Sequence, residues 1–353
     1  MHNNKYNFHF LGTTSMKIFK VVFGFTLCLM LASCNGNRLD VDISSIEMED
    51  IEIKRLDQDV FNLDTLNLEA NTNVLIGKYG NFYKIFVRSI LNNGGMRDSS
   101  YAYRMKRFIT DKDMSEAYDL CQATYPNLNE FNEELTRVFK RYKYHFPNSE
   151  PPQVVAMMSG FNRSSVFVDS TLAIGLEMYL GKDCKFYRML GLKNYKIIFM
   201  NPETMMSDAI RTWMFEEHPF KMNKNDFLSE IIYLGKILYL NDALQPNVHD
   251  TIKIQYTKKQ LDYCVQNEHN IWTYFIAQKT LYTTNHAEII KFTGEGPFTA
   301  AFSKESAPRI GYWIGWQIVR KFMQNNPAIS VQELMAIDDA QTILSKAKYK
   351  PKK

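Results

Sequence analysis

The stretch Leu31-Ala32-Ser33-Cys34, which closes an apolar run, constrains this chain most, because it has the pattern of a lipobox. Lys17 and Lys20 supply a basic segment ahead of the uncharged run Val21–Leu31, and small residues precede the cysteine, as a signal peptidase requires. We therefore predict that residues 1–33 are a lipoprotein signal peptide and that Cys34 becomes the acylated N-terminus. Several acyl chains, such as palmitate, would make the anchoring to a membrane nearly permanent.

An ordinary signal peptide or a membrane-spanning helix is the alternative interpretation of this segment. The apolar run is shorter than the ~20 residues that a spanning helix needs. Met16 followed by Lys17 is the more natural start, so residues 1–15 are interpreted as a mis-assigned extension. No later segment is predicted to cross a membrane, since the most apolar one, Phe227–Leu240, carries Glu230 and Lys236.

The charge of the mature chain argues against nucleic-acid partners. The whole sequence has a formal net charge of +4, and the predicted cleavage removes three lysines and no acid, which leaves +1. A nearly balanced surface lacks the basic footprint of a nucleic-acid-binding protein. The content of 45% hydrophobic and 14% aromatic residues is sufficient for a large core.

Three cysteines, Cys121, Cys184 and Cys264, remain after Cys28 leaves with the signal and Cys34 is acylated. An odd number permits one disulfide with one buried thiol, or three buried cysteines that serve as small apolar residues, and we favour the second. None of the three has the local signature of a catalytic cysteine.

The residue pattern predicts an α+β fold that is mostly helical with a small β-sheet. A polar tether over residues 34–50 precedes a single envelope domain over residues 51–350. This domain is divided into a helical N-terminal lobe (51–147), a β portion (153–180) and a helical C-terminal part (201–348). Prolines between the first two parts favour a change of architecture there. The strands are predicted by β-branched residues, including Val154, Val155, Val166 and Val168.

Apolar spacings of three and four residues, together with capping residues, predict several helices. Arg55-Leu56-Asp57 is interpreted as an edge strand that leads into helical structure, and Asn127 as the cap of a later helix. Further helices are predicted over Met205–Phe215, Asp226–Leu240 and Lys258–Leu281. A capping box, Ser330 to Glu333, and Asp338 with Asp339 begin the last two helices.

Several short motifs together resemble the GldB-type gliding-motility lipoproteins, and the resemblance covers most of the mature chain. Besides the lipobox and Arg55-Leu56-Asp57, the motifs are Ser159-Gly160-Phe161-Asn162, the run from Ile174 to Gly181, and Gly311-Tyr312-Trp313-Ile314-Gly315. The resemblance implies a cell-envelope lipoprotein linked to surface motility and its secretion apparatus. It does not imply a known reaction.

That family is in turn distantly similar to predicted zinc peptidases, which carry His-Glu-x-x-His on a helix. The spacing matters because residues four apart share a helical face and can bind one metal. Here no two histidines of the mature chain are four apart, and the corresponding segment, Ile231–Tyr239, is apolar apart from Lys236. The sequence therefore predicts no metal site and no cofactor. A metal-free zincin-like arrangement is one form that the α+β fold could take.

Other groups of polar residues have weaker patterns. Glu216-Glu217-His218 contains metal-ligand types, but a solvated helix end explains it better. Paired carboxylates, Asp57 with Asp59 and Asp111 with Asp113, are interpreted as strand-edge or cap residues rather than as acid–base pairs. Thr293–Pro297 has too few glycines for a phosphate loop and is interpreted as a turn. We assign no catalytic residue.

Ala307, Gly311 and Gly315 are four apart and share one helical face, where another backbone could approach closely. Burial in the core of the domain is the default interpretation. The alternative is a surface on which a partner docks, with Gly311, Tyr312, Trp313, Gly315 and Trp316 as the candidate residues. Leucine at either glycine is expected to cost on the order of 1–3 kcal/mol by overpacking.

These observations lead to one functional hypothesis and two alternatives. The hypothesis is a lipid-anchored, periplasm-facing envelope protein, a non-catalytic structural or assembly component of a gliding-motility or secretion apparatus. Its partners would be the membrane, through the anchor, and envelope proteins, but no nucleic acid. The alternatives are a peptidase-like hydrolase with an unrecognised site and a glycan-binding lipoprotein.

Overall fold

The structure, a computed structural model, describes Met1 and residues 37–352. The chain divides into two units, Met1–Asp40 and Val41–Lys353. Within the first unit, Asn37–Asp40 forms a turn in which Asp40 donates its backbone N–H to the Asn37 carbonyl at 2.8 Å. All helices and strands below belong to the second unit. The predicted signal peptide and Cys34 lie outside the described residues.

A four-stranded sheet lies at the centre of the second unit. Its strands are β1 (Lys54–Arg55), β2 (Gln153–Met157), β3 (Ser165–Val168) and β4 (Thr171–Gly175), in the order β1-β2-β4-β3. β1, β2 and β4 run parallel, whereas β3 pairs antiparallel with β4. The strands predicted from the valines are thereby confirmed. Asp169 and Ser170 join β3 to β4 with left-handed backbones (φ 52° and 53°), as a tight hairpin of favourable twist requires.

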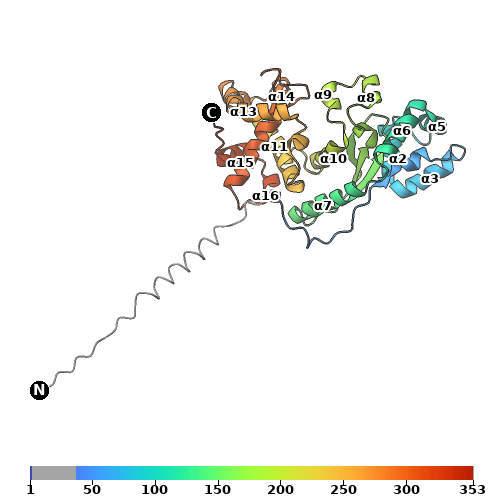
Figure 1. The fold of residues 1–353 in the computed structure, drawn as a ribbon, viewed down its shortest axis with the longest axis horizontal. Coiled ribbons are helices and arrows are strands. Elements are labelled where there is room, and N and C mark those ends of the chain that lie inside the picture. The colour runs from blue at the N-terminus through green and yellow to red at the C-terminus, as the bar shows by residue number, and fades with distance from the viewer. Residues whose placement is uncertain (2–36, 353) are drawn as a thin grey trace. The chain divides into compact units, whose positions relative to one another are not determined.

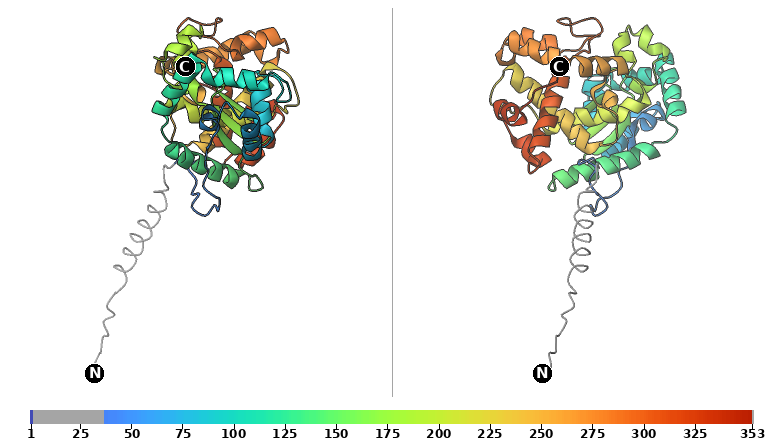
Figure 2. Two further views of the ribbon diagram at one scale, coloured as in Figure 1. Left: turned by 90° about the vertical axis from the view of Figure 1, so that its right-hand side faces the viewer. Right: turned by 60° about the vertical axis from the view of Figure 1, so that its left-hand side comes forward.

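Helices of the N-terminal part lie beside the sheet (Figures 1 and 2), and those within residues 56–110 pack on one face of it, whereas Phe139 and Tyr142 of the last one pack against Trp213. They are α2 (Leu56–Phe61), α3 (Leu68–Tyr79), α4 (Asn81–Ile85), the π-helix η1 (Phe86–Ile90), α5 (Tyr101–Thr110), α6 (Lys112–Thr124) and α7 (Asn129–His145). Val155 and Met157 of β2 pack into one apolar cluster with Phe82 and Met105. Burial of these large side chains is the main contribution to the stability of this half.

The C-terminal part is helical and begins with α10 (Pro202–Glu217), which packs against β3, β4 and α11. Two long helices, α11 (Phe227–Leu244) and α15 (Ile310–Asn325), form the most extensive packing between elements of the unit. The remaining elements are η2 (Leu176–Tyr179), α8 (Lys185–Met189), α9 (Asn194–Ile197), α12 (Asp250–Ile254), α13 (Lys258–Ala277), η3 (Thr280–Tyr282), α14 (His286–Thr293), α16 (Val331–Ala336) and α17 (Ala340–Ala347). The predicted α+β class, mostly helical with a small sheet, is confirmed.

Most predicted caps are present. The Ser330 side chain and the Glu333 side chain form the reciprocal capping box of α16, and Asp339 caps α17. Asn127 also caps as predicted: its Oδ1 accepts the backbone N–H of Asn129, the first residue of α7, at 3.2 Å, although Leu128 occupies the N-cap position itself. The helix predicted to Leu281 ends at Ala277, where the left-handed Lys279 (φ 54°) turns the chain into η3.

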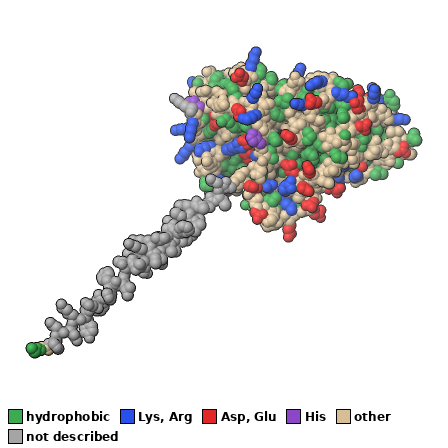
Figure 3. Space-filling model, in the orientation of Figure 1, with side chains coloured by type: hydrophobic (Ala, Val, Ile, Leu, Met, Phe, Trp, Pro, Cys, Tyr) green, Lys and Arg blue, Asp and Glu red, His purple; other side chains and the backbone are tan. Residues whose placement is uncertain are grey.

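The described residues agree with two predictions from the sequence, a nearly balanced surface charge and no membrane-spanning helix after the N-terminal segment. Acidic and basic side chains are interspersed over the face shown in Figure 3, in line with the nearly balanced charge of the predicted mature chain. Within residues 37–352 no helix is both long and apolar enough to span a membrane. In α11, Lys236 is buried and donates to the carbonyls of Met335 and Ile337 at 2.9 and 2.7 Å.

Candidate functional site

The candidate site lies where the parallel strands β2 and β4 end. The carboxyl edge of parallel strands is where ligands commonly bind in open sheets. Ser159 follows β2, and Glu177 follows β4 at the start of η2, so two of the motifs noted in the sequence meet here. Gly175 is required at this point, since a Cβ on it would collide with the Arg163 carbonyl of the loop that follows β2.

The carboxylate of Glu177 is fully buried and holds this loop in place. Its Oε1 accepts the backbone N–H of Ser159 at 2.6 Å, the Ser159 hydroxyl at 2.5 Å and the backbone N–H of Phe161 at 3.1 Å. Phe161 has a left-handed backbone (φ 61°), a strained state for a bulky residue that its bond to Glu177 helps to maintain. The other oxygen, Oε2, is buried without a hydrogen-bond partner.

Burial raises the pKa of Glu177 to about 7, and the three donated hydrogen bonds limit that rise. The Ser159 hydroxyl also lies 3.0 Å from the Arg163 carbonyl, so its single proton has a second acceptor when the carboxyl group is protonated. The group therefore titrates near neutral pH inside a preformed backbone cage.

Replacing Glu177 with glutamine is expected to remove part of the dependence of stability on pH. Because the folded pKa of about 7 exceeds the ordinary value of 4.5, the native state binds this proton more tightly. The free energy of unfolding therefore falls as pH rises from 4.5 to 7, by about 3 kcal/mol from this group. Denaturant unfolding of both proteins at several pH values measures the difference.

The difference between the two proteins is the informative quantity, because other groups titrate nearby. Burial lowers the pKa of His145 and His218 to about 4, so these two groups make stability rise with pH between 4 and 6.5. Both proteins share that contribution. Parallel curves of stability against pH for wild type and Glu177→Gln would contradict the assignment.

A cavity of about 330 Å³ adjoins this cage on the side of the C-terminal helices. Tyr179 of η2 reaches into a polar network there and donates its hydroxyl to Asp208 of α10 at 2.5 Å. Asp208 also forms an ion pair with Arg211, one turn along the same helix, and accepts the Gln255 amide at 3.3 Å. The aspartate therefore has three donors, from η2, from its own helix and from the residue that follows Ile254.

Arg309, just before α15, forms the opposite wall of the cavity. Its buried guanidinium donates to Glu295 at 3.2 Å and to the Ile254 carbonyl at 2.9 Å, while its Nε has no partner. Both Arg309 and Gln255 have left-handed backbones (φ 48° and 55°). Strained non-glycine residues often cluster at functional sites. Chemically, the cavity can bind a small polar group between two arginines and a tyrosine hydroxyl.

The structure places the predicted docking face of α15 inside the protein. Gly315 lies directly against the Ile231 carbonyl of α11, and Gly235 of α11 lies against the Gly315 carbonyl, so a Cβ at either position would collide with backbone. Trp313 and Trp316 are buried as well, while Tyr312 is half-buried with Arg309 5.4 Å from its ring. The default interpretation, burial in the core, therefore holds for the two glycines, and the alternative of a docking surface was wrong. The backbone that approaches them belongs to α11 of the same chain.

The carboxylate pairs have structural roles. Asp111 caps α6 by accepting the backbone N–H groups of Asp113 and Met114. Asp57 is buried against Arg55 at 2.7 Å, and Asp59 accepts from Lys78 and Tyr79, both at 2.6 Å. No group of three potential metal-ligating side chains comes together in the part of the chain that the structure describes.

The remaining candidates differ in part from their interpretation. Glu216 and Glu217 are exposed, as expected for a solvated helix end. That prediction was wrong for His218, which is half-buried, with its Nε2 3.1 Å from the Tyr142 hydroxyl. In the turn Thr293–Pro297, Glu295 pairs with Arg309. All three cysteines are free, but the burial prediction was wrong for Cys184, which is half-buried because it lies at the exposed start of α8.

Sequence reasoning missed Asp208, Arg211, Gln255 and Arg309 as site residues. Asp208 and Arg211 have an i,i+3 spacing of opposite charges, a signal that also occurs on ordinary helix surfaces. Gln255 and Arg309 have left-handed backbones that nothing in their residue types indicates. Their contacts are also distant in sequence, which no local pattern reveals.

Together the small sheet, the helical cover and the buried polar site define a mostly helical α+β domain. The family model described as gliding motility protein GldB matches residues 36–351, so the chain belongs to this family of gliding-motility lipoproteins. Neither the search of curated proteins nor the search of solved structures gave a match. Membership associates the protein with the cell envelope and with gliding motility. A zincin-like arrangement stays a prediction.

Proposed function

We propose that this protein is a lipid-anchored, periplasm-facing component that helps to assemble the gliding-motility or secretion apparatus and performs no catalysis itself. Family membership supplies the biological setting. The observation that supports a non-catalytic role is that the carboxylates of Glu177 and Asp208 are already occupied by hydrogen bonds within the protein. Both hold parts of the same chain together.

A hydrolase needs a general acid or base within hydrogen-bonding reach of its substrate. The Oε1 of Glu177 accepts three hydrogen bonds from the loop that follows β2, and the whole side chain is buried. The carboxylate oxygens of Asp208 accept hydrogen bonds from Tyr179, Arg211 and Gln255. A substrate would have to break these bonds before either carboxylate could act, so their arrangement favours a structural role.

Two nearly isosteric variants test the non-catalytic assignment. Glu177→Gln keeps an acceptor oxygen for the loop but cannot transfer a proton as a carboxylate does, and Tyr179→Phe removes the hydroxyl from the cavity. In the protein's own host, with the original gene deleted, both variants are expected to restore surface spreading and protein secretion to the wild-type level. Loss of function by variants with normal abundance and normal melting temperature would favour a hydrolase instead.

The lipid anchor is tested by Cys34→Ala. This variant is expected to leave the membrane or to accumulate as an uncleaved precursor, because the acylated cysteine is the only anchor that we propose. Membrane fractionation followed by mass spectrometry of the N-terminal peptide measures the outcome. An unmodified Cys34 in the membrane-bound wild-type protein would refute the anchor. Cys184→Ala, at the half-buried one of the three cysteines that the structure describes, is the matched control and should remain in the membrane.

A further inference from the structure

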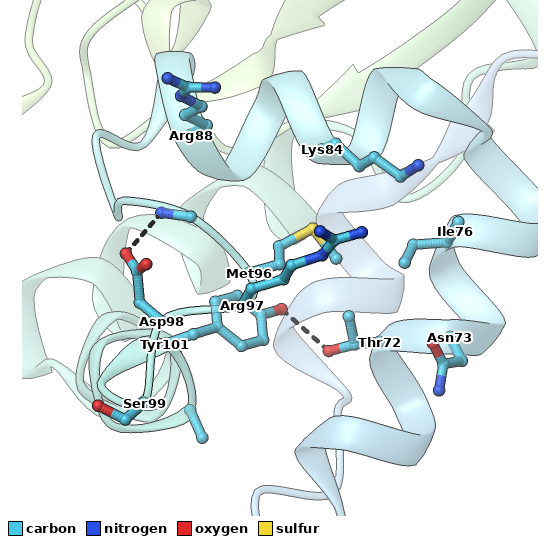
Figure 4. Close-up of a pocket in the computed structure, with 12 residues that line it drawn as sticks. Thr72, Asn73, Ile76, Lys84, Arg88, Met96, Arg97, Asp98, Ser99 and Tyr101 are labelled. Atoms are coloured by element: carbon cyan, nitrogen blue, oxygen red, sulfur yellow. Dashed lines mark hydrogen bonds between the residues drawn. The ribbon is translucent and has the colours of Figure 1, made fainter.

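A second cavity, larger than the one beside Tyr179, lies among the N-terminal helices. It has a volume of about 940 Å³ and opens between α3, the segment α4–η1 and the loop that precedes α5. Figure 4 shows Lys84 and Arg88 on one helical segment, with the Arg88 side chain directed away from Lys84, Asn73 and Ile76 on another, and Arg97 reaching across the space between the two segments. The cavity is therefore lined by basic side chains from two separate segments.

The charges that line this cavity are unbalanced. Lys84, Arg88 and Arg97 form no ion pair with any residue that the structure describes, and all three are exposed. The one acid of the lining, Asp98, is already engaged by the Gly95 backbone N–H at 2.8 Å and by Arg104 at 3.2 Å. Like charges four residues apart on a helix repel each other, as Lys84 and Arg88 do. An anion in the cavity would relieve this repulsion.

The hydroxyl groups of Thr72 and Tyr101, which line the cavity, have no proton left for a ligand. The Thr72 hydroxyl donates to the Leu68 carbonyl at 2.6 Å, so in its 2.9 Å contact with Tyr101 it must accept. Tyr101 therefore donates to Thr72 and must accept from Tyr83, whose hydroxyl lies 3.1 Å away. Every hydroxyl proton in this row is used. The basic side chains at the rim are left as the principal donors for a ligand.

The walls are held in a defined geometry. Arg104 donates to the Asn93 carbonyl at 2.5 Å and pairs with Asp98, which fixes both ends of the loop that carries Arg97. Arg88 lies on the π-helix η1, a rare geometry that is frequent at functional sites. The carbonyl that ends η1, at Ile90, accepts the Asn162 amide at 3.1 Å. The opposite wall is thus fixed to the loop that Glu177 holds.

We propose that this cavity binds a phosphate-bearing polar ligand, with the phosphate held by Arg97 and Lys84, and by Arg88 once its exposed side chain turns inward from the direction that Figure 4 shows. A phosphate monoester brings nearly two negative charges and three acceptor oxygens in one group, which suits three cations, and guanidinium groups bind it bidentately. The volume exceeds that of a bare ion and leaves room for a body of the size of a sugar against Asn73 and Ile76. Such a group occurs on glycolipid headgroups and on soluble sugar phosphates.

The test uses the full-length lipoprotein in neutral detergent, titrated with glucose 6-phosphate, glucose and inorganic phosphate by calorimetry. Glucose 6-phosphate is expected to bind more tightly than inorganic phosphate, and glucose should not bind. Arg88→Gln and Arg97→Gln should each weaken binding about tenfold or more. Arg107→Gln, an exposed arginine of α5 outside the cavity, is the matched control and should bind as the wild type does.

Vesicles distinguish the two sources of the phosphate. Protein expressed from Asn35 onward, which lacks both the apolar segment and Cys34, is mixed with phosphatidylcholine vesicles with and without a phosphorylated glycolipid. Binding that needs the glycolipid and both arginines assigns the headgroup, whereas binding of glucose 6-phosphate alone assigns a soluble ligand. Equal affinity in wild type, Arg88→Gln and Arg97→Gln would overturn the proposal, as would glucose binding as tightly as glucose 6-phosphate. The inference does not depend on the proposed function.

Discussion

Replacing Gly315 with alanine is expected to destabilise the protein by about 3 kcal/mol or more, which is the upper end of the usual cost of overpacking or beyond it. At this position α15 crosses α11 with backbone against backbone, and a Cβ would lie well inside contact distance of the Ile231 carbonyl. A carbonyl of a helix cannot rotate away as a flexible side chain can. The two helices would have to separate along the most extensive packing of the domain.

Two other glycines provide graded controls for this prediction. At Gly311 a Cβ would lie 3.0 Å from the Ile231 Cγ2 and 3.1 Å from the Phe292 carbonyl, so alanine should cost less there. At Gly77, inside α3, nothing lies within 4 Å, and alanine should stabilise by about 0.5–1 kcal/mol. Midpoints of urea unfolding measure all three. If Gly315→Ala unfolds at the same midpoint as Gly77→Ala, the proposed helix crossing is wrong.

Features set by neighbouring residues were predictable from the sequence. The strands at Val154 and Val166, the capping box at Ser330 and the cap at Asp339 each depend on a few adjacent residues, and the structure contains all of them. The end of the helix predicted to Leu281 was not predictable. It depends on a left-handed residue, Lys279, whose type does not require that backbone.

Features that join distant segments could be predicted only in part. The spacing of Gly311 and Gly315 correctly indicated a close approach of another backbone. That backbone is α11, in which Gly235 meets Gly315 from 80 residues away in the sequence. A single glycine in an apolar helix gives no sign of its partner. The small-residue pattern favoured a core but also fitted a docking surface until the fold placed α11 beside it.

The candidate site was missed for a related reason. Glu177 belongs to a motif that was recognised, but a glutamate in a sequence shows neither its burial nor its donors. Its cage is built from the loop after β2, 18 residues earlier, because β2 and β4 are parallel neighbours. Arg309 pairs with Glu295 in a segment that looked like an ordinary turn. Both interactions follow from topology, which local patterns do not encode.

Replacing Asp242 with alanine is expected to destabilise the protein by about 3–5 kcal/mol, because it leaves the buried amine of Lys253 without compensation, whereas Arg320 keeps its ion pair with Asp250. Its carboxylate accepts from Lys253 at 2.8 Å, from Arg320 at 2.8 Å and from the Trp316 indole at 2.9 Å. The side chains of Lys253 and Asp242 are only 3% and 7% exposed. Water therefore cannot solvate the amine that the substitution leaves behind.

Asp262→Ala is the matched control, since it removes an ion pair of the same chemistry at the surface. Lys258 and Asp262 are 2.8 Å apart with 82% and 47% of their side chains exposed, so their pair should contribute between 0 and about 1 kcal/mol. Lys253→Met should cost less than Asp242→Ala, because Arg320 and the Trp316 indole continue to compensate the aspartate. A loss in Asp242→Ala no larger than that in Asp262→Ala, measured by denaturant unfolding at neutral pH, would show that the buried amine finds another partner or water.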